Sequence, residues 1–91
     1  MAELSMKVSV TGKVQGVGFR AWTRDRAEAH GLRGWVANRG EDTVEAVFAG
    51  DHAAIEEMLG EIRAGGPEAA SVDEVETAPA EYDETGFEVR G

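Results

Sequence analysis

The first apolar residues of the chain fall on alternate positions. From Met6 to Thr11, apolar side chains at even positions alternate with polar side chains at odd positions, which predicts a strand with one buried face. From about Phe19 to His30 the spacing becomes that of a helix, and Trp22 and Ala27 supply much of its apolar side. Gly31 follows directly, and a glycine at that place commonly ends a helix.

The middle of the chain predicts a hairpin. One strand is expected from Leu32 to about Asn38 and the next from Thr43 to Ala49, and the short polar turn 39–42 joins them. Alternate apolar residues place one face of the second strand in the core. These residues are Val44, Ala46 and Phe48.

A second helix and two further strands are expected after the hairpin. The helix spans roughly Asp51 to Ala64, with Asp51 as its N-cap, and the run Gly65-Gly66-Pro67 ends it. Its apolar residues recur at the spacing of one buried stripe, namely Ile55, Met58, Leu59 and Ile62. A strand through Val72, Val75 and Thr77, a polar connection over 78–86 and a short closing strand over 87–90 complete the chain.

This order of elements is β-α-β-β-α-β with a short extra strand at the end. Half-buried strands and amphipathic helices bury their apolar faces against each other, so two layers are expected. We therefore predict an α+β, ferredoxin-like two-layer sandwich, with an antiparallel sheet and two helices on one of its faces. The 91 residues suffice for one core, and we expect a single domain over residues 1–91.

The chain is strongly acidic, with 18 acidic and 9 basic residues and a formal net charge of −9. Such a field repels nucleic acid and anionic membrane surfaces, so neither is expected as a partner. No apolar run is long enough to span a membrane, and the start of the chain lacks the apolar segment of a signal peptide. Without cysteine, the simplest expected location is a reducing cytoplasm. The acidity is explained equally well by a high-salt cytoplasm or by solubility alone.

The stretch from Val10 to Arg20 carries the most specific chemistry. It runs from the first strand through a glycine-bearing loop into the first turn of a helix. Such a loop exposes consecutive backbone N–H groups, and the helix adds the positive end of its dipole, so an anion site is expected. Arg20 supports this, because a cation at that end of a helix is unfavourable unless an anion compensates it. A short glycine pattern by itself is more often only a turn.

Two segments of the sequence resemble the signatures of the acylphosphatase family. The first is 12–20, which reads Gly-Lys-Val-Gln-Gly-Val-Gly-Phe-Arg, and the second is 34–38, which reads Gly-Trp-Val-Ala-Asn. The element order, the length and the closing strand 87–90 are also similar. The chain departs from many relatives at Ala37, where a longer and often basic residue is common.

The resemblance implies an enzyme that hydrolyses an acyl phosphate to a carboxylate and inorganic phosphate, without a metal or another cofactor. It implies that Arg20 binds the phosphoryl group together with backbone N–H groups of the loop, and that Asn38 positions the attacking water. The loop residues expected at the substrate are Gln15, Gly16, Val17, Gly18 and Phe19. We expect the enzyme to act as a monomer.

Three finer expectations concern how these side chains are held. Thr43, across the hairpin, would fix the Asn38 side chain by a hydrogen bond, and we count it among the substrate-site residues for that reason. If the closing strand lies near the loop, the carboxylate of Gly91 could pair with Arg20 in the empty site. The side chain of Gln15 is expected to stabilise the loop rather than to contact the ligand.

Other residues have simpler explanations. No His/Asp/Glu group has metal-ligand spacing, and His30 and His52 are expected to be structural or solvated. Trp22 and Trp35 are expected to be buried or half-buried, although one of them could form a shelf for the substrate.

Two alternative functions remain open. One is a non-enzymatic module of the same fold that docks a phosphorylated partner, and the presence of both Arg20 and Asn38 disfavours it because a binder has no need to hold water. The other is an RNA-binding sheet with the same element order. That sheet would need stacked aromatic residues and a basic surface, and the net charge argues against this function.

Overall fold

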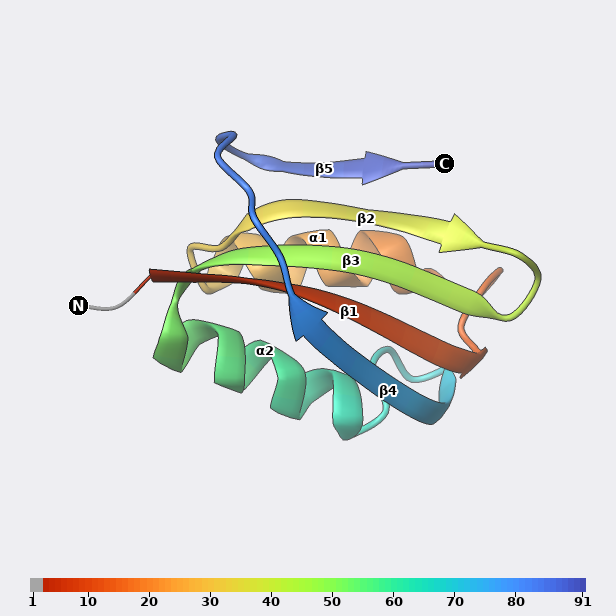
Figure 1. The fold of residues 1–91 in the computed structure, drawn as a ribbon. Helices are drawn as coiled ribbons and strands as arrows, with labels where there is room; N and C mark the ends of the chain where they lie inside the picture. The colour runs from red at the N-terminus through yellow and green to blue at the C-terminus, as the bar shows by residue number, and fades with distance from the viewer. Residues whose placement is uncertain (1–2) are drawn as a thin grey trace.

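Five strands and two helices make up the computed structural model, which describes residues 3–91 (Figure 1). In chain order they are β1 (Glu3–Lys13), α1 (Phe19–Ala29), β2 (Arg33–Arg39), β3 (Thr43–Asp51), α2 (His52–Arg63), β4 (Ser71–Pro79) and β5 (Phe87–Arg90). The predicted element order and the two-layer α+β architecture are confirmed. Asp51 caps α2 as predicted, because its side chain accepts a hydrogen bond from the Ala53 N–H at 3.2 Å.

The strands form one sheet in the order β4-β1-β3-β2-β5. Neighbouring strands are antiparallel except at one edge, where β5 runs parallel to β2, so the prediction of an entirely antiparallel sheet is wrong there. The connection 80–86 crosses the sheet at the end where β1 and β2 begin (Figure 1). The chain therefore enters β5 in the same direction as β2.

Both helices pack on one face of the sheet, and the side chains of that face form one hydrophobic core. α1 contacts β2, β3 and β5, whereas α2 contacts β3 and β4. Val8, Ala46 and Val36 lie side by side on this face of β1, β3 and β2. All three are buried in one cluster with the predicted apolar stripe of α2. Neither helix within residues 3–91 is long and apolar enough to cross a membrane.

β5 is held at the edge of the sheet by the aromatic ring of Phe87. This ring is buried and stacks on Phe48, with ring centroids 5.8 Å apart. Gly34 lies opposite Phe48 on β2, and a Cβ there would come within 3.2 Å of the Phe87 ring. The same Cβ would collide first with the backbone carbonyl of Val47 on β3, so only glycine fits where β3 and the Phe87 ring of β5 both approach β2.

The irregular spacing of Val72 and Val75 follows from a bulge between β1 and β4. Val10 pairs with Val75, but Gly12 pairs with Val72, so β4 contains one residue more than β1 over this interval. The extra residue restores the alternation, and both valines pack against the core despite being three positions apart.

Candidate functional site

The loop between β1 and α1 is anchored by its side chains. Val14 and Phe19 are buried in the core, and Val17 packs against it. Gln15 points elsewhere: its Nε2 donates hydrogen bonds to carbonyl oxygens of the β2–β3 turn, the shortest to Thr43 at 2.9 Å. The stabilising role predicted for the Gln15 side chain is confirmed.

The backbone of this loop carries unpaired hydrogen-bond donors. None of the N–H groups from Gln15 to Ala21 donates to another residue in the described part of the chain, and the first backbone bond of α1 runs from Trp22 to the Gly18 carbonyl. Gly16 and Gly18 have φ angles of 73° and 78°. Residues in this left-handed region, alternating with ordinary ones, give concave groups of N–H donors that bind anions. The predicted anion site therefore has a backbone geometry suited to it.

Arg20 lies in the first turn of α1, beside the end of β5. Its Nη1 atom is 3.5 Å from the carbonyl oxygen of Arg90, to which it donates a long hydrogen bond. Among residues 3–91, no carboxylate lies within 4 Å of the Arg20 guanidinium. The closing strand is thus near the loop as supposed, but a backbone carbonyl, not the Gly91 carboxylate, contacts Arg20.

A cavity of about 290 Å³ opens between the loop, α1 and β5. Its walls are formed by Gly16, Gly18, Phe19, Arg20, Ala21, Arg24 and Val89. Two arginines and no carboxylate line it, so the site is locally positive in a protein of net charge −9. Arg24 was missed in the sequence, although its position four residues after Arg20 places both on one side of the helix.

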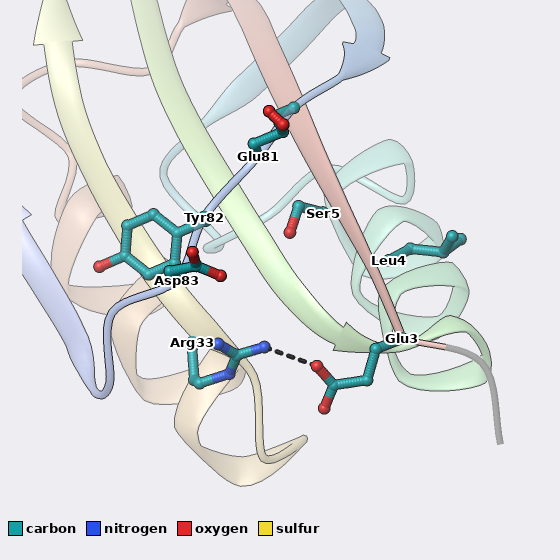
Figure 2. A pocket seen from close by; sticks show the side chains of 8 residues that line it. Glu3, Leu4, Ser5, Arg33, Glu81, Tyr82 and Asp83 are labelled. Carbon is teal, nitrogen blue, oxygen red and sulfur yellow. Dashed lines mark hydrogen bonds and ion pairs between the residues drawn. The ribbon is translucent and has the colours of Figure 1, made fainter.

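A larger cavity of about 440 Å³ lies at the opposite end of the sheet, under the connection 80–86 (Figure 2). Three carboxylates line it, those of Glu3, Glu81 and Asp83. Arg33, the one cation among the described residues that line it, points to Glu3 and pairs with it at 2.8 Å (Figure 2). This surplus of negative charge makes the larger cavity unsuitable for a phosphoryl group.

Asn38 lies near the end of β2, on the sheet face that the helices cover. It lies opposite Val44, whose side chain is in the core. The Oδ1 atom of Asn38 is buried and has no hydrogen-bond partner in the described chain. A buried amide oxygen without a partner is uncommon in folded proteins and is a ready acceptor for a water molecule.

Thr43 does not hold this amide. It lies opposite Arg39 in the hairpin, one position away from the pair formed by Asn38 and Val44. Successive residues of a strand point to opposite faces, so Thr43 and Asn38 have their side chains on different faces of the sheet. The Thr43 hydroxyl instead donates to Asp42 Oδ1 at 3.2 Å. The expected hydrogen bond to Asn38 is therefore absent from the described structure.

The fold brings Arg20 and Asn38 to the same end of the sheet. Arg20 contacts Arg90, and Arg90 pairs across the parallel strands with Ala37, the residue before Asn38. Gly91 continues along β2, and a Cβ on it would lie 3.9 Å from the Asn38 carbonyl oxygen. Asn38 is not one of the cavity-lining residues, so the anion site and this amide lie at the same end of the sheet without sharing one enclosed pocket.

The remaining candidates have structural positions. His30 is 12% exposed and contacts Glu61 at 2.9 Å and Glu57 at 3.4 Å, which confirms its structural role. Trp35 is half-buried on the sheet face away from the helices, and its ring lies beneath the guanidinium of Arg90. It therefore does not face the cavity and cannot support a substrate there. No group of three or more His, Cys, Asp or Glu side chains suited to a metal ion occurs among residues 3–91.

Comparison with known proteins decides the family. A model of the acylphosphatase family matches residues 6–89 of this chain. The chain belongs to the acylphosphatase family. The acylphosphatase of Rhodospirillum rubrum is 49% identical over 84 residues, which cover 91% of each chain. That of Rhodopseudomonas palustris strain BisB5 is 45% identical over 91 residues, covering 100% of this chain and 91% of the relative.

The solved structures agree with the sequences. The acylphosphatase of Coxiella burnetii superposes with a TM-score of 0.91 at 37% identity, covering 97% of this chain and 93% of that one. The chain is therefore an enzyme with acylphosphatase activity, which releases inorganic phosphate from a small acyl phosphate. This result favours the enzyme over both the docking module and the RNA-binding sheet.

Proposed function

We propose that the loop 15–20 and Arg20 bind the phosphoryl group of the acyl phosphate, that Asn38 positions the attacking water, and that no metal ion takes part. The observation that carries this proposal is the run of N–H groups from Gln15 to Ala21 that have no acceptor within residues 3–91, beside a guanidinium that meets no carboxylate there. A phosphoryl group supplies the acceptor oxygens and the negative charge that these groups require.

The reaction needs little beyond this arrangement. The water oxygen bonds to phosphorus, the bond from phosphorus to the bridging oxygen breaks, and its electron pair leaves with the acyl group as a carboxylate. Negative charge spreads over the equatorial phosphoryl oxygens in the transition state, so positioned positive groups lower the barrier. Arg20 suits this task because its planar guanidinium can donate to two oxygens at once.

Asn38 is suited to position the attacking water because its side chain is neutral. A carboxylate base would be repelled by the phosphoryl oxygens, whereas an amide oxygen accepts a hydrogen bond from the water without that repulsion. The unpartnered Asn38 Oδ1 atom supports this role. The proton of the attacking water passes to a phosphate oxygen, so the pH–rate profile is expected to show no essential protein base.

The test is hydrolysis of benzoyl phosphate in the presence of EDTA by wild type, Arg20→Ala and Asn38→Ala. We expect Arg20→Ala to lower kcat/KM by about 10²- to 10³-fold and to weaken phosphate binding, because both ground and transition states lose a cation. We expect Asn38→Ala to lower kcat by about 10²-fold while phosphate, measured by calorimetry, still binds. Circular dichroism checks that each variant is folded.

Asn38→Asp tests whether the side chain at this position must be neutral or only polar. It preserves the size of the residue but adds a charge beside the phosphoryl group, so it is expected to weaken phosphate binding where Asn38→Ala does not. An Asn38→Asp variant as active as wild type, or activity abolished by EDTA and restored by a divalent cation, would contradict the proposal.

A further inference from the structure

Two arginines share the cavity beside the loop, and phosphoryl binding needs only one of them. Arg20 stands next to the free N–H groups of the loop, whereas Arg24 lies one turn further along α1 and still lines the cavity. Residues four apart on a helix lie on the same side, displaced by about 6 Å along the axis. The cavity therefore continues from the proposed phosphoryl site towards a second cation.

Arg24 is poorly neutralised compared with most arginines of the chain. Its nearest carboxylate is Asp25 at 3.5 Å, and the side chains of the two are 43% and 67% exposed. Such an exposed contact between adjacent residues contributes little. Arg26, Arg33 and Arg39 instead meet carboxylates at 2.8, 2.8 and 2.9 Å. The guanidinium of Arg24 is thus available to a ligand in the cavity.

The part of the cavity between the two arginines is suited to an organic group. Ala21 lines it on the helix, and Val89 lines it on β5 with 40% of its surface exposed. Val89 is on the helix-facing side of β5, because it pairs with the buried Val36. With the phosphoryl group at Arg20, the acyl group would lie over these small apolar side chains and end near Arg24.

We propose that Arg24 is a specificity-determining residue, which binds a second anionic group on the acyl part of the substrate. The substrates it favours are acyl phosphates whose acyl group carries a carboxylate or a further phosphate. This inference rests on the proposed function, because it assumes that the phosphoryl group occupies the loop. The net charge of −9 repels such a doubly anionic substrate, so the second anion needs a local cation to bind.

The experiment compares benzoyl phosphate with 4-carboxybenzoyl phosphate, which differ only by the distal carboxylate. The ratio of kcat/KM for the carboxylated substrate to kcat/KM for benzoyl phosphate is measured in wild type, Arg24→Gln and Arg24→Lys. We expect Arg24→Gln to lower this ratio about tenfold, chiefly through KM, because it removes a charged hydrogen bond to the distal group. Arg24→Lys, which retains the charge but not the planar fork, should restore part of the ratio.

Arg63→Gln is the matched control, because Arg63 lies in the last turn of α2 and its substitution changes the net charge by the same amount. It should leave the ratio unchanged. A ratio unaltered in Arg24→Gln would overturn the inference, as would an equal fall for both substrates, which would place Arg24 at the phosphoryl group. Wild type inactive on benzoyl phosphate would overturn the proposed function itself, and the inference with it.

Discussion

Thr23 lies in the middle of α1 with its side chain in the core, where its Oγ1 atom has no hydrogen-bond partner among residues 3–91. A buried hydroxyl without a partner costs about 1–3 kcal/mol. Thr23→Val replaces that hydroxyl by a methyl group and retains the β-branch, so helix propensity hardly changes. We expect the free energy of unfolding, measured by urea denaturation, to rise by about 1 kcal/mol.

Thr23→Ser is the matched control for this substitution. It retains the hydroxyl and removes the buried methyl, so it should lower the free energy of unfolding by about 1 kcal/mol. If Thr23→Val were less stable than wild type, the hydroxyl would have to be hydrogen-bonded in solution.

Single residues were predictable where their chemistry depends on sequence neighbours. The anion loop and Arg20 follow from adjacent positions, and the structure gives that loop the expected free N–H groups. Thr43 was placed wrongly against Asn38 because the hairpin register decides which face each side chain takes, and composition does not fix that register. Arg24 was not predicted, because nothing in the sequence indicates that β5 lies beside that helix.

Two side chains at the end of α1, those of Arg26 and the C-cap residue His30, contact α2. Arg26 Nε donates to Glu61 Oε1 at 2.8 Å, and the Nε2 atom of His30 lies 2.9 Å from Glu61 Oε2. The hydrogen bond from Arg26 is the largest cause that lowers the pKa of Glu61, from 4.5 to about 2. Because the folded pKa is the lower one, ionised Glu61 stabilises the fold fully above about pH 4.5, and this contribution is lost as pH falls towards 2.

Glu61→Gln tests this bridge between the helices. At pH 7 we expect the free energy of unfolding to fall by about 1 kcal/mol, a modest value because the pair is partly exposed and water screens it. The difference from wild type should narrow as pH falls from 4.5 towards 2. Glu56→Gln, at an exposed contact with His52 on α2, is the control. A deficit in Glu61→Gln that stayed constant over this pH range would show that shape, rather than charge, matters at Glu61.

Most elements could be predicted because each has a local pattern, but their pairing could not. The spacing of Val72 and Val75 fits no single strand period, and only the bulge opposite Gly12 explains why both pack against the core. The parallel direction of β5 depends on the path of the connection 80–86, whose residues are polar and carry no direction signal. The missing side chain at Gly34, which admits Phe87, is meaningful only once these two strands are neighbours.

The net charge of the whole molecule is opposite in sign to the local charge of its site. The net charge of −9 repels an anionic substrate from a distance, while Arg20 and Arg24 attract it only within the cavity. The Debye length is about 10 Å at 0.1 M ionic strength, so added salt screens the distant charges more than the cations the substrate touches. We therefore expect kcat/KM for benzoyl phosphate to rise, by about two- to fivefold, as sodium chloride increases from 10 to 200 mM.

A double variant shows whether distant charge causes this rise. Glu68→Gln with Glu76→Gln removes two exposed carboxylates from β4 and the segment before it, at the sheet edge opposite β5. The net charge becomes −7, and we expect a higher kcat/KM at low salt together with a weaker dependence on salt. A steady fall of kcat/KM with salt in both proteins would mean that attraction by Arg20 and Arg24 outweighs the field of the whole protein. In that case the local cations, and not the acidity of the chain, would decide how kcat/KM depends on salt.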